Sequence, residues 1–241
     1  MAYYITVVVA GLITGILWQF PQYGDYILWP FTLLATWVHE MGHGIMAELL
    51  TDFVRLEIYN DAGGVALTAQ SQSGFVNALI AAAGLLGPAV AGSFFIIFGR
   101  KEKSARYLLG GLGLVMLLSI LVYVRNAFGV VAVGGWVGAL IALSYFGSDK
   151  VCYFFVQFIG LQFCVNNFKD FDYMFIESFK RPDEHGDIKV MLSDTGAMAQ
   201  NLYLPYWVWG SLVAGSSVLM LIGSLYIANR KGLPQFGAKK A

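Results

Sequence analysis

The residues best suited to chemistry form one short motif, His-Glu-Met-Gly-His at positions 39–43. Residues four apart share one face of a helix, so the imidazoles of His39 and His43 can point at a single spot. Two such nitrogens suit Zn²⁺, and Glu40 beside the first histidine suits a general base that activates water. The alternative is an interfacial histidine pair that binds nothing. Because two of the three histidines of the chain form this motif, we interpret it as a zinc site.

The helix that must carry this motif is apolar enough to lie in a membrane. Tyr26–Val38 before the motif and Gly44–Leu50 after it are almost entirely apolar. Ionisable groups at membrane depth are costly, so they usually serve a function. The motif therefore predicts metal chemistry within or beside a lipid bilayer.

The composition of the whole chain is typical of a membrane protein. Of its 241 residues, 58% are hydrophobic and 12% are charged, which argues against a soluble domain. Apolar runs recur, and we predict an all-α polytopic membrane protein with about seven transmembrane helices, forming a single domain over residues 1–241. The sixth run is short and is expected to be re-entrant or tilted. The runs are Tyr3–Phe20, Tyr26–Leu49, Phe75–Phe98, Ala105–Val124, Phe128–Gly147, Val151–Val165 and Tyr206–Ala228.

The charges predict an orientation in the membrane. A net charge of zero argues against a nucleic-acid partner. Basic residues gather after the third run and at the end of the chain. With seven spans both clusters lie on one side, so the positive-inside rule predicts a cytoplasmic C-terminus in the plasma (inner) membrane. The start of the chain lacks a basic leader region, so we expect the first run to be retained. The clusters are Arg100, Lys101, Lys103 and Arg106, then Arg230, Lys231, Lys239 and Lys240.

A segment of different periodicity follows the motif helix. Apolar and polar residues alternate over Val54–Tyr59, the turn residues Asn60–Gly64 interrupt the pattern, and Val65–Thr68 resume an extended pattern. This predicts a β-hairpin over residues 53–70. One strand edge could pair with an extended substrate, which matters because a helix hides its carbonyls in its own hydrogen bonds. The alternative is a hairpin that only links two spans.

A catalytic zinc ion normally takes three protein ligands and leaves the fourth position to water. His185 lies in a strongly polar turn that is typical of a solvated loop. Glu48 lies about two and a half helical turns from His39, too far to close the same site. A carboxylate at position 194 could also serve as a helix N-cap. Spacing alone does not choose among the remaining candidates, Asp170, Asp172 and Asp194.

These motifs together resemble the site-2-protease-like zinc intramembrane metalloproteases, in particular a smaller branch found in bacteria and plants. The larger branch takes its third zinc ligand from a Leu-Asp-Gly motif, which this chain lacks. The smaller branch has Ser-Asp-Ala where this chain has Ser193-Asp194-Thr195. The resemblance therefore implies that Asp194, rather than Asp170, completes the site. It rests on residues 39–43, Gly63-Gly64, Ala83–Pro88, Arg125–Gly129, Ser193-Asp194 and Leu204–Trp209, within Phe31–Leu212.

The resemblance implies a zinc-dependent endopeptidase that cleaves membrane-embedded or membrane-proximal protein segments. If Asp194 is a ligand, Ser193–Asn201 should be a short helix or bend beside His39. Asn77 and Asn126 could orient a substrate backbone or bond across helices. The alternative functions are a metal carrier or scaffold that retains the fold, and a hydrolase of lipidated or small substrates. No repeated pattern of His or Asp along the spans favours a carrier, and a scaffold could lose Glu40 freely.

Overall fold

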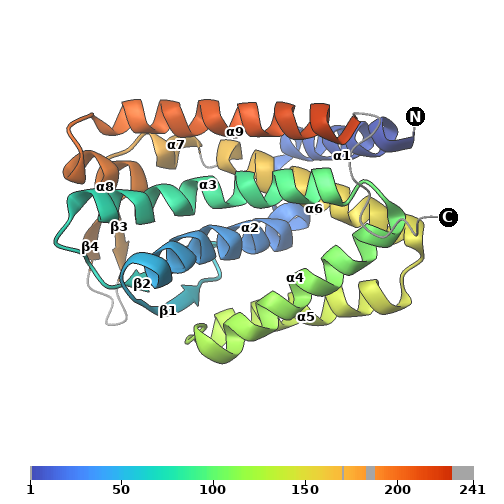
Figure 1. The fold of residues 1–241 in the computed structure, drawn as a ribbon, viewed down its shortest axis with the longest axis horizontal. Helices are drawn as coiled ribbons and strands as arrows, with labels where there is room; N and C mark the ends of the chain where they lie inside the picture. Colours follow the sequence, from blue (N-terminus) through green and yellow to red (C-terminus); the bar gives the residue numbers. More distant parts are fainter. Residues whose placement is uncertain (1, 170, 183–187, 230–241) are drawn as a thin grey trace.

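Seven long helices lie where the apolar runs predict them, within residues 2–169, 171–182 and 188–229, the part described by the computed structural model (Figure 1). The sixth helix is not short: it has 21 residues, because polar residues at both ends extend it beyond the apolar run. The helices are α1 (Ala2–Gln19), α2 (Pro21–Leu50), α3 (Gly74–Phe98), α4 (Glu102–Val122), α5 (Ala127–Phe146), α6 (Asp149–Lys169) and α9 (Tyr206–Asn229).

Among the described residues, four of these helices are long and apolar enough to cross a bilayer: α3, α4, α5 and α9. α1 contributes a shorter apolar helix over Thr6–Gln19. α2 and α6 have sufficient length but carry polar side chains; α2 has the histidine motif, and α6 contains the buried Gln157 and Gln162. Four such helices are typical of a polytopic membrane protein, and the count of seven spans stays a prediction.

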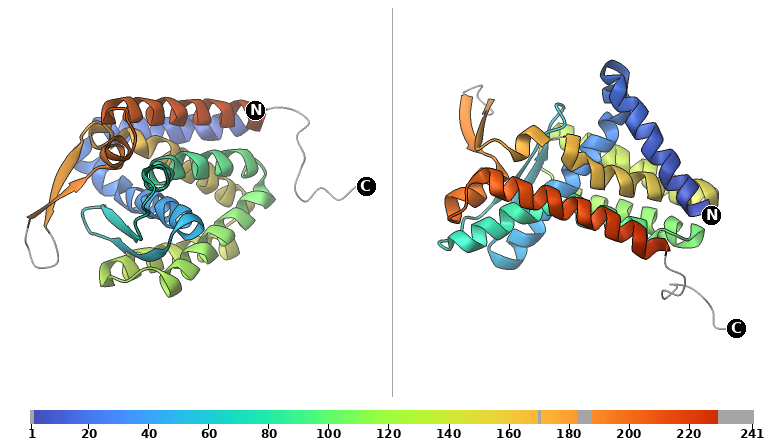
Figure 2. Two further views of the ribbon diagram at one scale, coloured as in Figure 1. Left: turned by 60° about the vertical axis from the view of Figure 1, so that its left-hand side comes forward. Right: turned by 90° about the horizontal axis from the view of Figure 1, so that it is seen from above.

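α3 is the central helix and packs against α2, α6, α8 and α9 (Figures 1 and 2). Small residues allow this close packing, as is common between membrane helices. A side chain at Gly42 of α2 would collide with the Ala83 carbonyl of α3. A side chain at Gly92 of α3 would collide with the Gly160 carbonyl of α6. α4 and α5 form a helical hairpin that packs mainly on α6.

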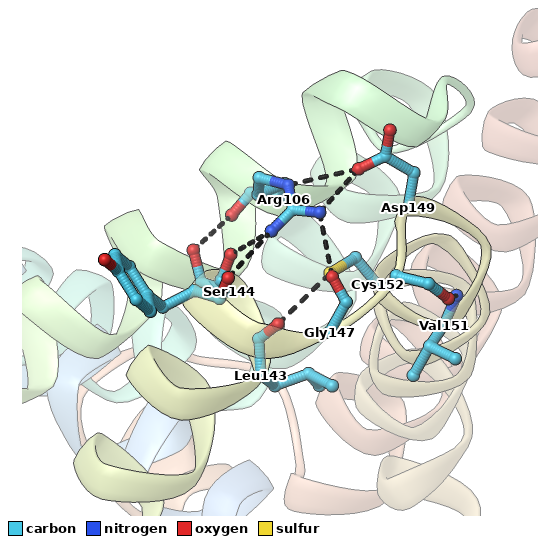
Figure 3. Close-up of polar contacts among 9 residues, drawn as sticks. Arg106, Leu143, Ser144, Gly147, Asp149, Val151 and Cys152 are labelled. Atoms are coloured by element: carbon cyan, nitrogen blue, oxygen red, sulfur yellow. Dashed lines mark hydrogen bonds and ion pairs between the residues drawn. The ribbon is translucent and has the colours of Figure 1, made fainter.

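Arg106 of α4 joins the ends of α5 and α6 (Figure 3). Its guanidinium donates to the carbonyls of Ser144 and Gly147, at 2.5 and 2.8 Å, at the end of α5. It also donates to Oδ1 of Asp149, at 2.6 Å, in the first turn of α6. The last carbonyls of a helix lack partners within it, so Arg106 caps α5. One cation of the first basic cluster therefore has a structural role.

In the described residues, two small antiparallel sheets lie at one end of the helical bundle (Figures 1 and 2). The first confirms the predicted hairpin. The second has no counterpart in the sequence prediction, because its charged surroundings are typical of a solvated loop. The shorter elements are β1 (Phe53–Ile58), β2 (Gly64–Thr68), α7 (Phe171–Met174), β3 (Ser178–Pro182), β4 (Ile188–Leu192) and α8 (Asp194–Asn201).

Candidate functional site

α2 places the polar side chains of the motif against α3. Glu40 and His43 are buried, and His39 is partly buried. Nδ1 of His43 lies 2.7 Å from the carbonyl oxygen of Ile80. Because a carbonyl can only accept, Nδ1 carries the proton and donates this hydrogen bond. This bond leaves the Nε2 lone pair of His43 for another partner. A side chain at Gly84 would collide with the imidazole of His43, so the close approach of α3 requires glycine there.

Asp194 of α8 joins the two histidines. Its Oδ2 lies 3.1 Å from Nε2 of His39, and its Oδ1 lies 3.3 Å from Nε2 of His43. The two Nε2 atoms lie 3.1 Å apart. The donor atoms of these three side chains all lie within 4.8 Å of one another. Residues from distant parts of the chain thus form one group that could bind a metal ion.

The N-terminus of α8 directs Asp194 toward the histidines. Ser193, rather than Asp194, is the N-cap: its Oγ accepts from the backbone N–H of Gly196 at 3.0 Å. The same Oγ donates to the carbonyl of Ile176 at 2.5 Å, which fixes the start of α8. A side chain at Gly196 would collide with the backbone of Glu177, so α8 packs closely on this segment. The carboxylate of Asp194 is therefore not needed as a cap.

Charged neighbours keep Asp194 ionised. Burial alone raises the pKa of Asp194, but the attraction and hydrogen bonds of His43 and His39, when their Nε2 atoms carry protons, hold this pKa below its usual range. A metal cation bound in place of these protons would act on the carboxylate in the same direction. The hydroxyl of Tyr173 donates to Oδ2 of Asp194 at 3.4 Å. Burial, and then the nearby Asp194 charge, raise the pKa of Tyr173, so this hydroxyl stays protonated. An ionised carboxylate is the form that a metal ligand requires.

The donor group fits a zinc ion in chemistry and in spacing. Two imidazole nitrogens and one carboxylate oxygen are a common set for catalytic zinc. Ligand atoms about 2.0 Å from a tetrahedral ion lie about 3.3 Å from one another. The two Nε2 atoms are 3.1 Å apart, Oδ2 of Asp194 is 3.1 Å from His39, and Oδ1 of Asp194 is 3.3 Å from His43. Both carboxylate oxygens therefore face the imidazole nitrogens at distances close to those between tetrahedral ligands.

The other predicted candidates are not part of this group in the described residues. Asp172 is exposed on α7. Glu48 is hydrogen-bonded to Tyr123 at the end of α4. Asp170 and His185 lie outside the described residues. Asp194 is thus the candidate carboxylate that the described structure brings to the histidines.

Glu40 lies outside the donor group and faces β2. Its carboxylate is hydrogen-bonded to the backbone of Ala66. A side chain at Gly64 would collide with Glu40 and with Thr36. The hydroxyl of Thr36 donates to the carbonyl of Ala62 at 2.7 Å, in the turn of the hairpin. α2 thus holds the hairpin against the glutamate.

The outer edge of β1 is occupied by the segment that follows α4. The backbone N–H of Leu56 donates to Tyr123 at 2.9 Å, and its carbonyl accepts from Arg125 at 3.0 Å. The side chain of Asn126 accepts from the N–H of Ile58 at 3.1 Å and donates to its carbonyl at 2.5 Å. Asn126 therefore positions the hairpin.

The outer edge of β2 faces Glu40. In the described chain β2 pairs with β1 and with no other strand. Leu56 and Ile58 direct their backbone groups away from β2, so they form non-hydrogen-bonded pairs with Ala66 and Gly64. The backbone groups of Ala66 and Gly64 consequently point to the outer edge of the sheet. This edge is the place where a further strand could pair.

Two cavities meet at Glu40. One has a volume of about 470 Å³ and follows the turn of the hairpin. The other has a volume of about 400 Å³, follows β2 and includes His43 and Asp194 in its walls. Together they form a cleft along β2, which we call the β2 cleft. The residues lining both cavities are His39, Glu40, Gly64, Tyr173 and Phe179.

Several residues of the site are absent from the sequence prediction. Ile80 acts through its backbone carbonyl, which no side-chain pattern reveals. Tyr173 and Phe179 contact each other edge to face, with ring centroids 5.6 Å apart, in the wall of the β2 cleft. Tyr173 lies directly after Asp172, but an aromatic residue there is no specific signal. Asn77, by contrast, is a predicted candidate: it binds the backbone of Ser71, at 2.9 Å for both bonds, and lines the second cavity.

A histidine–aspartate group on α2 and α8 beside α3, one of the apolar candidate spans, fits a polytopic membrane metalloprotein. The chain belongs to the Peptidase M50B-like family, which matches residues 5–224 and is the site-2-protease family. The predicted family resemblance is thereby confirmed, and the members of this family are in general zinc enzymes. No curated protein and no solved structure matches the chain.

Proposed function

We propose that the chain is a zinc-dependent intramembrane endopeptidase that hydrolyses peptide bonds of membrane-embedded or membrane-proximal protein segments. The observation that carries this proposal is the convergence of His39, His43 and Asp194 beside Glu40 in the β2 cleft. Membership of a peptidase family supports the reaction class. The presence of a buried Glu40 in the cleft favours hydrolysis over a carrier or scaffold role.

His39, His43 and Asp194 are the residues that would hold zinc. A zinc ion, when bound, acidifies a water molecule and polarises a carbonyl group. Glu40 accepts the proton of the attacking water at its carboxylate and delivers it to the leaving amine. The hydrogen bond from Ala66 and the contact with Gly64 keep this carboxylate in one orientation. Ile80 fixes the tautomer of His43 that binding requires.

The substrate is proposed to enter the β2 cleft as an extended strand. The carbonyl of Ala66 points to the outer edge of β2, where it could accept a main-chain hydrogen bond from a substrate strand, while the N–H of Ala66 is bonded to Glu40. A strand in this position passes Glu40 and exposes its peptide carbonyls, which a helix would keep in internal hydrogen bonds. Phe179 and Tyr173 offer apolar contacts for its side chains.

The protein is proposed to lie in the plasma (inner) membrane as a multi-pass protein with a cytoplasmic C-terminus. The basic residues around the α3–α4 connection support this orientation by the positive-inside rule. Arg106, which pairs with Asp149, also belongs to this cluster. The second basic cluster lies outside the described residues.

Cleavage by a Glu40→Gln variant tests the proposed reaction. The wild type, reconstituted in vesicles, should cleave a single-span test protein whose span contains a helix-breaking Asn-Pro pair. Glu40→Gln should bind zinc normally and cleave about 10²–10⁴-fold more slowly, because it lacks the general base. Glu48→Gln is the matched control: the same change at an exposed position of α2 should leave the rate unaltered. Cleavage by Glu40→Gln at the wild-type rate would refute the mechanism.

A further inference from the structure

A third cavity, of about 780 Å³, lies between α2, α3 and α4, and we call it the α3–α4 crevice. On α2 it is lined by Val38, Gly42 and Ile45, whose spacing places them on one helix face. His39 and His43 belong to a different face of α2, and the crevice shares no lining residue with the β2 cleft. The proposed proteolysis therefore leaves this cavity without a role.

The α3–α4 crevice is lined mainly by apolar side chains and is open between α3 and α4. α3 and α4 diverge from their connection, and α2 lies between them (Figure 1). The floor includes the buried side chains of Trp37, Phe95 and Phe163. At the rim, Val90 is 54% exposed and Tyr107 is 78% exposed. Because α3 and α4 are candidate membrane spans, this opening faces the lipid.

The volume of the crevice favours an acyl chain over a helix. A spanning helix about 30 Å long and 10–12 Å wide occupies more than roughly 2,000 Å³. A sixteen-carbon acyl chain occupies roughly 480 Å³, at about 30 Å³ for each carbon, close to the share of one water molecule. The crevice volume of about 780 Å³ accommodates such a chain and does not accommodate a whole helix.

The narrow end of the crevice carries positive charge. Tyr107, Gly111 and Val115 of α4 line the crevice at a spacing of four residues. Lys103 lies one turn earlier on the same face and is exposed. The α3–α4 connection adds Arg100 and Lys101 at this end. A tyrosine next to basic residues is typical of the membrane interface, where lipid phosphates lie.

From this arrangement we infer that the α3–α4 crevice binds an anionic phospholipid. One acyl chain lies along α3 and α4, and the phosphate lies beside Lys103. The end of the acyl chain reaches the part of the crevice formed by Met41, Ile45 and Leu79. This lipid site is separate from the proposed protease site and does not depend on proteolytic activity.

Photolabelling of the full chain tests the site. The purified wild type in detergent is mixed with phosphatidylglycerol that carries a diazirine at the end of one acyl chain, irradiated and digested. The label should concentrate on residues 41–46 and 79–86. Phosphatidylcholine with the same acyl chains should label these residues about fivefold less, because it lacks the attraction of a cation for an anionic headgroup. Label spread evenly over α1, α5 and α9, or equal labelling by both lipids, would overturn the proposal.

Two glycine variants distinguish lipid binding in the crevice from lipid binding elsewhere on the lipid-facing surface. A Cβ at Gly111 or at Gly135 meets no atom within 4 Å, so a side chain can begin at either position without a collision. Gly111→Leu fills the crevice and should reduce labelling about tenfold, the effect of displacing about two methylene groups. Gly135→Leu, on α5, should leave labelling unchanged. Lys103→Ala should weaken the preference for phosphatidylglycerol, because the phosphate is placed beside Lys103, while Arg100 and Lys101 remain. If Gly111→Leu is labelled as strongly as the wild type, the proposal is wrong. This outcome does not depend on whether the protein is an active protease.

Discussion

At the scale of single residues, His43 is the most constrained member of the metal-binding group. Its Nδ1 is bound to the Ile80 carbonyl, and its Nε2 lies near both Asp194 and His39. Both ring nitrogens therefore have defined partners, so α2 and α3 orient the imidazole before any metal binds. Such orientation lowers the cost of assembling a metal site.

The choice of Asp194 as the third ligand is tested by zinc affinity. Asp194→Ala should lower zinc affinity by more than about 100-fold, since the loss of a ligand should exceed the effect of losing a supporting contact. Asp170→Ala should leave affinity unchanged. Zinc titration against a competing chelator measures both variants. Normal affinity in Asp194→Ala, with loss in Asp170→Ala, would reverse the assignment.

The sequence predicts the residues of this group unequally. His39, Glu40 and His43 lie within five consecutive residues of one helix, so their spacing alone brings them together. Asp194 comes from a distant segment, and only a family resemblance favours it over Asp170. The Ile80 and Tyr173 contacts depend on the packing of α3 and α7, which local patterns do not encode.

At the scale of elements, β2 links the fold to the proposed reaction. The alternation of apolar and polar residues predicts the first hairpin, because one strand face is buried. The same pattern does not predict the second hairpin, β3 and β4. In β4 the apolar residues Ile188, Val190 and Leu192 are exposed. Alternation indicates a strand most clearly where burial separates the two faces, and β4 lacks that separation.

A substitution at Gly64 tests the contact between β2 and α2. Gly64→Ala adds a Cβ that collides with Glu40. β2 or Glu40 must then shift, and a displacement of about 1 Å can slow catalysis roughly 100-fold. Zinc content should stay normal, because Gly64 contacts none of the donor atoms of the metal-binding group. Gly138→Ala, where a Cβ meets no atom within 4 Å, is the control. Unaltered cleavage by Gly64→Ala would contradict a role for this contact.

At the scale of the whole molecule, the cavity at the site is lined by residues of α2, α3 and α8 and of the two small sheets. Figure 2 shows these sheets at one end of the helical bundle. Hydrophobic runs predict the seven long helices, since each must bury an apolar surface in protein or lipid. The number of spans does not follow from helix length. α2 and α6 are long, but polar groups such as Glu40 and Gln157 reduce their apolar character. Glu40 is buried against β2 and Gln157 is buried within the bundle, so both are enclosed by protein rather than exposed to lipid.

The most direct test of the account is the zinc content of the purified protein. The wild type should contain about one zinc ion per chain, as a mononuclear site requires. Glu40→Gln should contain the same amount, because Glu40 lies outside the donor group. The double variant His39→Ala/His43→Ala should lose nearly all of its zinc, as measured by plasma mass spectrometry. Full zinc occupancy in the double variant would contradict the site described for this protein.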